Sequence, residues 1–188
     1  MSARSVHVVG VGAQTSIGPT APATSAAARA AVCRFKDHPF MTDAAGERMR
    51  VARVPWLPPE LPLGDRVRAL LQGAAQEALA AIAAPLADLR AAPRLGIVLA
   101  VSDDRPGLPP RWRQQVGDGL LPSFRDRFKT ASIEVCSPGP AAGVAAIQRG
   151  GQLLLNDEAT SAWSAAPTAT WDPRTCCRSR PASNCMGR

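Results

Sequence analysis

The sequence predicts an α/β protein in which a mostly parallel sheet lies between layers of helices. Short runs of branched apolar residues, which are typical of strands, alternate along the chain with longer segments of helical periodicity. Residues 94–101 (RLGIVLAV) are apolar almost without interruption, which indicates a strand covered on both faces. The chain has 188 residues, of which 46% are hydrophobic, so it is large enough to bury the core of one domain.

Two elements are expected near the start of the chain. Residues 6–11 (VHVVGV) form a β-branched run before Gly12, and this predicts a buried strand that enters a loop. The alanine-rich residues 20–32 predict a helix, because Thr20 can cap its start and Pro22 lies in its first turn.

A loop and a long helix follow. Residues 33–62 contain five prolines after position 38 and predict a loop with one short strand at 49–54. Residues 65–86 predict a helix, because their apolar side chains recur at helical spacing on one face.

The remaining elements lie between residues 94 and 155. The strand at 94–101 is followed by a polar, proline-containing crossing at 103–110. A short helix is expected at 120–128, a third strand at 131–135, and a helix with small residues in its first turns at 139–155. This order of strands and helices predicts one layered domain over residues 1–158.

The composition changes after Glu158. Residues 159–188 show no sustained periodicity, and they carry three of the five cysteines and two of the four tryptophans. We therefore expect an aberrant tail at 159–188 that adds no strand to the sheet and is either disordered or the product of a frameshift.

The charge of the chain does not predict a nucleic-acid partner. The net charge is +7, but the basic residues form no aromatic or helical arrangement of the kind that reads bases. No stretch approaches eighteen uninterrupted apolar residues, and the first residues lack the pattern of an export signal. We therefore expect no membrane partner and a cytoplasmic location.

The cysteines and histidines do not predict a metal site. Cys33 and Cys136 stand alone, the other cysteines lie in the tail, and both histidines, His7 and His38, are far upstream. Neither a zinc-binding spacing nor a disulfide framework follows from this arrangement, and no cofactor is expected.

The glycines after the first predicted strand permit a dinucleotide-binding interpretation. Gly10 and Gly12 fit the first two positions of that motif, but Thr15 stands where the third glycine belongs. The next helix is expected only from Thr20, which is too late to face a phosphate held by these glycines. A nucleotide-binding α/β module stays open as a less favoured alternative.

The same residues resemble another family more closely. Residues 8–18 (VVGVGAQTSIG) are similar to the opening of β-ketoacyl-acyl-carrier-protein synthases, which are condensing enzymes of the thiolase-like class. The resemblance continues through the helix near Thr20, the loop with Phe35 and the helix at 65–86, and it is most specific at 140–159. It implies an incomplete thiolase-like layered fold, consisting of the amino-terminal half only.

The resemblance also implies where the nucleophile belongs. The family places a cysteine at a strand-to-helix turn, in a stretch that reads approximately Cys-Ala-Ser-Gly-x-His-Ala-Ile. Residues 140–147 (PAAGVAAI) match it without a gap, so Pro140 occupies the nucleophile position. Proline has no nucleophilic side chain and no amide hydrogen. Cys136 is either a structural thiol at the end of the preceding strand or, as a weaker alternative, a displaced nucleophile.

The expected function follows from this match. The family takes two histidines from its carboxy-terminal half, and neither His7 nor His38 matches those motifs, so we expect a catalytically inactive relative. By resemblance, the partners are acyl carrier protein and a second ketosynthase chain, as a homodimer or heterodimer. The alternative is a non-catalytic partner subunit of an active ketosynthase, similar to a chain-length factor.

The tail can be related to the same family. With suitable codons, a one-nucleotide shift near Glu158 changes the tail into Asp-Val-Cys-Leu-Val-Gly-Gly-Ala-Asp-Ser-Tyr-Leu-Gly. This resembles the strand and glycine pair that follow the nucleophile helix in the family. The fixed codons of Trp163 and Trp171 are compatible with the shift.

Overall fold

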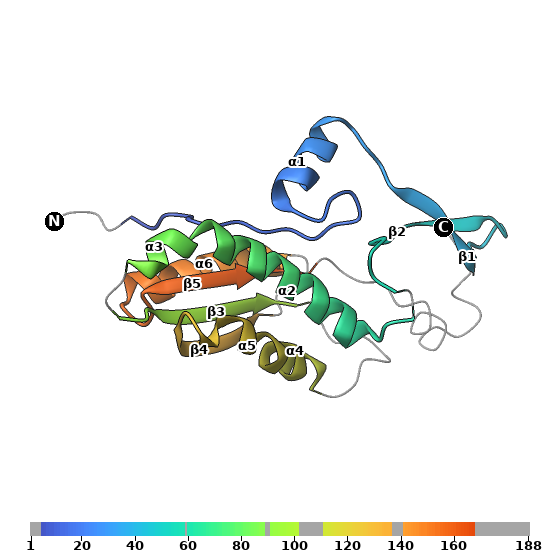
Figure 1. Ribbon diagram of the computed structural model, residues 1–188. Helices are drawn as coiled ribbons and strands as arrows, with labels where there is room; N and C mark the ends of the chain where they lie inside the picture. The colour runs from blue at the N-terminus through green and yellow to red at the C-terminus, as the bar shows by residue number, and fades with distance from the viewer. Residues whose placement is uncertain (1–4, 59, 89–90, 102–110, 137–140, 168–188) are drawn as a thin grey trace.

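The computed structural model describes residues 5–58, 60–88, 91–101, 111–136 and 141–167, and it has a parallel sheet between helices (Figure 1). In chain order the elements are α1 (Ala21–Arg29), β1 (Phe35–Thr42), β2 (Arg48–Ala52), α2 (Leu63–Ala81), α3 (Ala83–Ala87), β3 (Arg94–Ala100), α4 (Trp112–Leu120), α5 (Pro122–Arg125), β4 (Lys129–Cys136), α6 (Ala142–Leu155) and β5 (Ser161–Ala165).

The central sheet has the order β4-β3-β5, and β3 pairs in parallel with both neighbours. Side chains of β3 alternate between the two faces. Leu95, Ile97 and Leu99 pack with α2, α4 and α5, whereas Val98 and Ala100 pack with α6. A parallel sheet covered on both faces confirms the α/β class and the layered arrangement predicted from the apolar run at 94–101.

The long helix α2 was predicted well, except at its end. Val67, Leu71 and Ala75 are buried on the face that its periodicity indicates. The helix ends at Ala81 instead of continuing to residue 86, because Ile82 leaves the helical region with φ −112° and ψ 10°. The short helix α3 then follows.

The prediction of a strand at residues 6–11 was wrong. These residues pair with no strand in the described part of the chain, and Val8 and Val9 are 82% and 69% exposed. They cross the outer side of α2, where a Cβ atom on Gly10 would lie 2.5 Å from the carbonyl oxygen of Ala78. Strand propensity describes how well a side chain fits a half-buried pleated surface. Here β4 and β5 pair with both edges of β3, so neither edge of that strand is open to residues 6–11.

The prediction that no strand follows Glu158 was also wrong. β5 pairs in parallel with β3, with Leu95 opposite Ser161 and Leu99 opposite Ala165. The ring of Trp163 lies 5.2 Å from that of Phe124, so this strand contributes to the core. The described fold therefore crosses the predicted boundary at 158, and residues 168–188 lie outside the described residues.

The segment expected as a loop with one strand contains a hairpin, β1–β2, which projects from the layered body in Figure 1. The backbone N–H groups of Phe40 and Met41 donate to Nδ1 of His38 at 3.2 and 3.1 Å, beside the irregular register of β1. At the tip, Asp43 accepts from Ala45 and Glu47. These local bonds were not recognisable from the prolines and polar residues.

The remaining elements differ from their predictions mainly at their ends. The short helix expected at 120–128 corresponds to α5, which ends earlier, at Arg125, whereas α4 at residues 112–120 was not predicted. β4 is longer than the predicted 131–135, and α6 begins three residues later than residue 139.

Candidate functional site

The candidate site lies where β4 ends and α6 begins, at the edge of the sheet where the parallel strands have their carboxyl ends. β4 ends at Cys136, and α6 begins at Ala142 with Ala141 as its N-cap residue. Pro140, the predicted nucleophile position, lies outside the described residues but directly precedes this N-cap. Ligands of α/β proteins commonly bind at this edge of the sheet.

Small residues allow α6 to lie close to β5. The hydroxyl group of Ser164 donates to the carbonyl oxygen of Ala146 at 2.9 Å. A Cβ atom on Gly150 would lie 2.6 Å from Oγ of Ser164, and one on Gly143 would lie 3.4 Å from Cβ of Ala166. The small residues therefore set the position of the helix start relative to the sheet edge.

Within the described part of the chain, no side chain caps the start of α6. Ala141 makes no side-chain hydrogen bond, and the first turn contains no acidic residue. The aligned peptide dipoles of a helix give its first N–H groups a partial positive charge. A nucleophile held beside these N–H groups would therefore be stabilised in its anionic form.

A salt bridge further along α6 ties this helix to β4. Nε of Arg149 lies 2.7 Å from Oε2 of Glu134, and NH2 of Arg149 also reaches Glu158 at 3.5 Å. The hydrogen bond from Arg149 lowers the pKa of Glu134 below its usual value, while desolvation opposes this shift.

Cys136 belongs to the sheet. Its carbonyl oxygen accepts from the N–H of Val101 at 3.0 Å, and its half-buried side chain packs with the apolar cluster between β3 and α6. His7 lies in the amino-terminal segment, where it contacts Ser5, and His38 lies in the β1–β2 hairpin. The structure does not place either histidine on the elements that form this turn.

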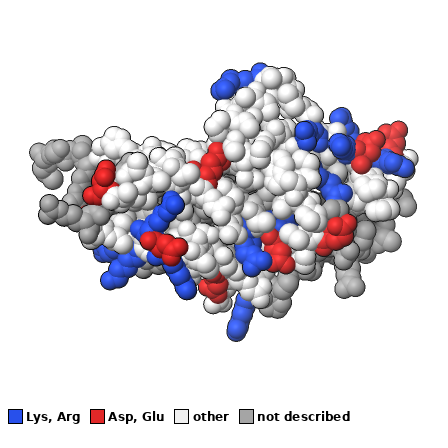
Figure 2. Space-filling view, viewed as in Figure 1, with Lys and Arg blue, Asp and Glu red and all other residues white. Residues whose placement is uncertain are grey.

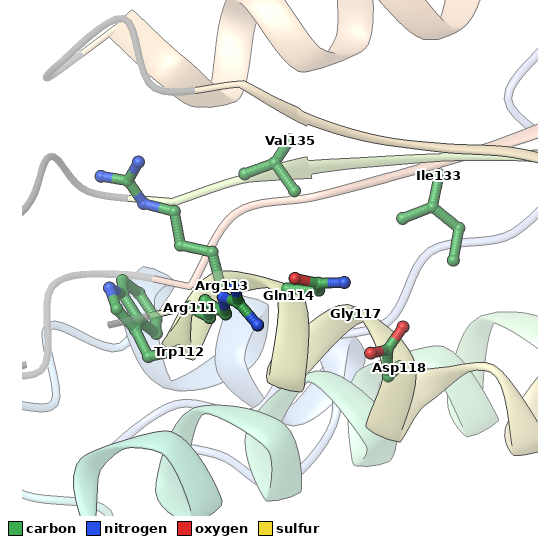
Figure 3. A pocket seen from close by; sticks show the side chains of 8 residues that line it. All are labelled: Arg111, Trp112, Arg113, Gln114, Gly117, Asp118, Ile133 and Val135. Carbon is green, nitrogen blue, oxygen red and sulfur yellow. The ribbon is translucent and has the colours of Figure 1, made fainter. Parts of the chain in front are cut away.

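A second feature of this region is a pocket on the opposite face of the sheet, which sequence reasoning missed (Figure 3). It has a volume of about 480 Å³ and lies between α4 and β4. Its lining residues are Arg111, Trp112, Arg113, Gln114, Gly117, Asp118, Ile133 and Val135. The only local sequence signal is the pair of arginines around a tryptophan, which by itself does not distinguish a pocket from a solvated surface.

Charged residues are mixed on the face seen in Figure 2. Lysine and arginine side chains lie beside aspartate and glutamate side chains, including on the projecting hairpin, and form no large basic patch on this face. Among the described residues, no group of three or more histidine, cysteine or acidic side chains is arranged to hold a metal ion. None of the described helices is both long enough and apolar enough to cross a membrane.

Comparisons of this chain with protein-family models, curated proteins and solved structures found no match. The function of this chain must therefore be inferred from its residues and their arrangement.

Proposed function

We propose that this chain is the amino-terminal part of a thiolase-like β-ketoacyl synthase and that it does not itself form an acyl-thioester intermediate. The observation that carries the proposal is the junction of β4 and α6. Position 140, where the family motif requires a cysteine, directly precedes the N-cap residue Ala141 of a helix rich in small residues.

The chemistry of this position explains why we expect no condensation. A cysteine there would lie at the partially positive start of α6, which favours the thiolate that attacks an acyl thioester. Pro140 provides neither a thiol nor a backbone N–H for an oxyanion. Cys136 lies within the strand and packs against apolar side chains, which supports a structural role for its thiol.

The outer face of α6 supports the second candidate, a non-catalytic subunit that pairs with an active ketosynthase. Val144 and Ile147 are 71% and 67% exposed, and Leu155 is also exposed on this helix. Positions 144, 147 and 155 share one face of the helix at helical spacing, and apolar side chains gathered on an exposed face are typical of a protein–protein contact. Copurification of the chain with a cysteine-bearing synthase would favour this role over that of an inactive remnant.

Acyl carrier protein and a second ketosynthase chain are the partners that we propose with this function. We also propose a cytoplasmic location for this function.

DNA sequencing of the locus provides the first test. We expect another reading frame, open after the codon for Glu158, that encodes the Asp-Val-Cys-Leu-Val-Gly-Gly continuation and two histidine motifs. An original frame with no such continuation in either other frame would contradict the frameshift and weaken the family proposal.

The second test is acyl trapping on the full chain and on the chain with its reading frame restored. With a radiolabelled acyl-carrier-protein substrate, neither should retain hydroxylamine-labile label, whereas Pro140→Cys in the restored chain should acquire it. Cys136→Ala is the matched control and should change neither result. Label that maps to Cys136 in the original chain would overturn the proposed inactivity.

A further inference from the structure

We propose that the pocket between α4 and β4 binds a small organic anion with an apolar tail. The chemical class is a carboxylate or phosphate head group attached to a short hydrocarbon chain. This inference does not depend on the proposed function, because none of the residues that line the pocket belongs to the predicted nucleophile motif at 140–147.

The separation of the two sites follows from strand geometry. Successive side chains of a strand point to opposite faces of the sheet. Cys136 packs with the apolar cluster under α6, whereas the neighbouring Val135 lines the pocket beside α4. The pocket and the apolar cluster that contains Cys136 therefore lie on opposite faces of β4.

The size of the pocket suits a small molecule. Its volume of about 480 Å³ lies within the range of about 300–1,000 Å³ that is common for ligand sites. Such sites combine apolar walls with a few polar groups that fix the orientation of the ligand. Ile133 and Val135 supply the apolar wall here, and both lie on the edge strand β4 (Figure 3).

The polar groups are divided between two ends of the pocket. Arg111 and Arg113 lie at the start of α4, and Asp118 lies further along the same helix beyond Gly117, as Figure 3 shows. Guanidinium groups bind carboxylate and phosphate with paired hydrogen bonds. The carboxylate of Asp118 repels an anionic head group. This division favours an anionic head group at the arginine end, with the tail along Ile133 and Val135.

Trp112 separates the two arginines and adds a further polar group. It is only 5% exposed, and its indole N–H donates to no acceptor within the part of the chain that the structure describes. A buried donor without an acceptor is unfavourable. The ring of Trp112 belongs to the core cluster that includes Val67 and Leu71 of α2, so we assign the anionic head group to the two arginines that flank Trp112 in the sequence.

Calorimetric titration of the full chain with sodium octanoate, below its micelle concentration, tests the proposal. We expect saturable binding at one site, with octyl phosphate binding as well and octylammonium not binding. Inorganic phosphate alone should bind at least tenfold more weakly than octyl phosphate, because it lacks the tail.

Variants locate the site. Arg111→Gln, at an exposed position, should weaken octanoate binding at least fivefold, and Asp118→Asn should strengthen it by removing a repelling charge. Arg125→Gln on α5 is the matched control, because Arg125 is exposed but does not line the pocket, and it should leave the affinity unchanged.

Three results would overturn the proposal: no saturable heat with either octyl anion, equal affinity in Arg111→Gln and Arg125→Gln, or octylammonium binding as tightly as octanoate. The last result would indicate adsorption of the alkyl chain without recognition of the head group. Circular dichroism of each variant shows whether a loss of binding reflects a loss of fold.

Discussion

The backbone N–H of Ala21 donates a hydrogen bond to the carboxylate of Glu77 at 2.8 Å. The same carboxylate accepts from the N–H of Ala13 at 2.9 Å, so one side chain of α2 holds both the start of α1 and the segment before it. The first N–H groups of a helix have no partner within the helix. Glu77 therefore supplements the cap that Thr20 provides to Ala23.

Replacing Glu77 should loosen the amino-terminal segment. Glu77→Gln keeps one acceptor oxygen and loses the charge, so it should reduce the free energy of unfolding by about 1 kcal/mol. Urea unfolding measures this change, and limited proteolysis should show faster cleavage before α1. The control Glu60→Gln, at an exposed position, should change neither measurement; equal effects of the two variants would contradict the role of Glu77.

Gly12 should not tolerate a side chain. A Cβ atom on Gly12 would overlap the carbonyl oxygen of Ala74, which belongs to the backbone of α2 and cannot rotate away. Gly12→Ala should therefore destabilise the fold by about 1–3 kcal/mol or detach the segment from α2. Hydrogen exchange across residues 5–13 distinguishes these outcomes.

Gly64→Ala is the matched control for this substitution. A Cβ atom at Gly64 would have no neighbour within 4 Å, and the position lies in the first turn of α2. Alanine there should be neutral or should stabilise the helix by up to about 1 kcal/mol. If Gly12→Ala were equally harmless, that result would contradict the close contact between residues 5–13 and α2.

The salt bridge between Glu134 and Arg149 should make stability depend on acid pH. The folded pKa of Glu134 is lowered, chiefly by the hydrogen bond from Arg149, so its contribution is present above the unfolded pKa of about 4.3. That contribution is lost as the pH falls through the lower, folded pKa. Arg149→Gln should therefore flatten the decrease in urea midpoint below about pH 4.3.

The control for this pH dependence is Arg29→Gln, which removes an exposed arginine whose side chain contacts Ser25. Its urea midpoint should follow the original chain at every pH. A similar flattening in both variants would indicate a general effect of net charge and would exclude the specific pair as its cause.

Trp163 tests whether β5 belongs to the fold. Its ring packs against Phe124, which is fully buried. Trp163→Ala should therefore lower the free energy of unfolding by about 3 kcal/mol, as measured by thermal or urea unfolding. Trp56→Ala removes a tryptophan that is 40% exposed and loses its hydrogen bond to Gln14, which should cost about 1 kcal/mol. A smaller loss for Trp163→Ala than for Trp56→Ala would contradict the placement of β5.

Elements with a strong pattern were predictable from the sequence. The apolar run at 94–101 indicated a strand buried on both faces, and β3 has that position between two neighbours. The spacing of Val67, Leu71 and Ala75 indicated the buried face of α2. In both cases the pattern indicates burial directly, because an apolar side chain is driven out of water whichever segments pack against it.

The candidate site was predictable only in part. The strand and the helix that enclose position 140 followed from residues 131–155, and the structure confirms both elements around that turn. The pocket beside α4 was not predictable, because its arginines come from a helix and its apolar wall from a strand of another segment. A local sequence pattern does not encode which segments meet.

The sequence alone determined the α/β class, the main helices and the chemistry present at position 140, because these depend on the side chains of continuous segments. Only the tertiary structure decided which strands adjoin β3. Residues 6–11 have the stronger strand propensity, yet residues 161–165 take the place in the sheet. Each edge of a strand accepts one partner, so the competition for that edge is resolved by packing across the whole domain and not by local preference.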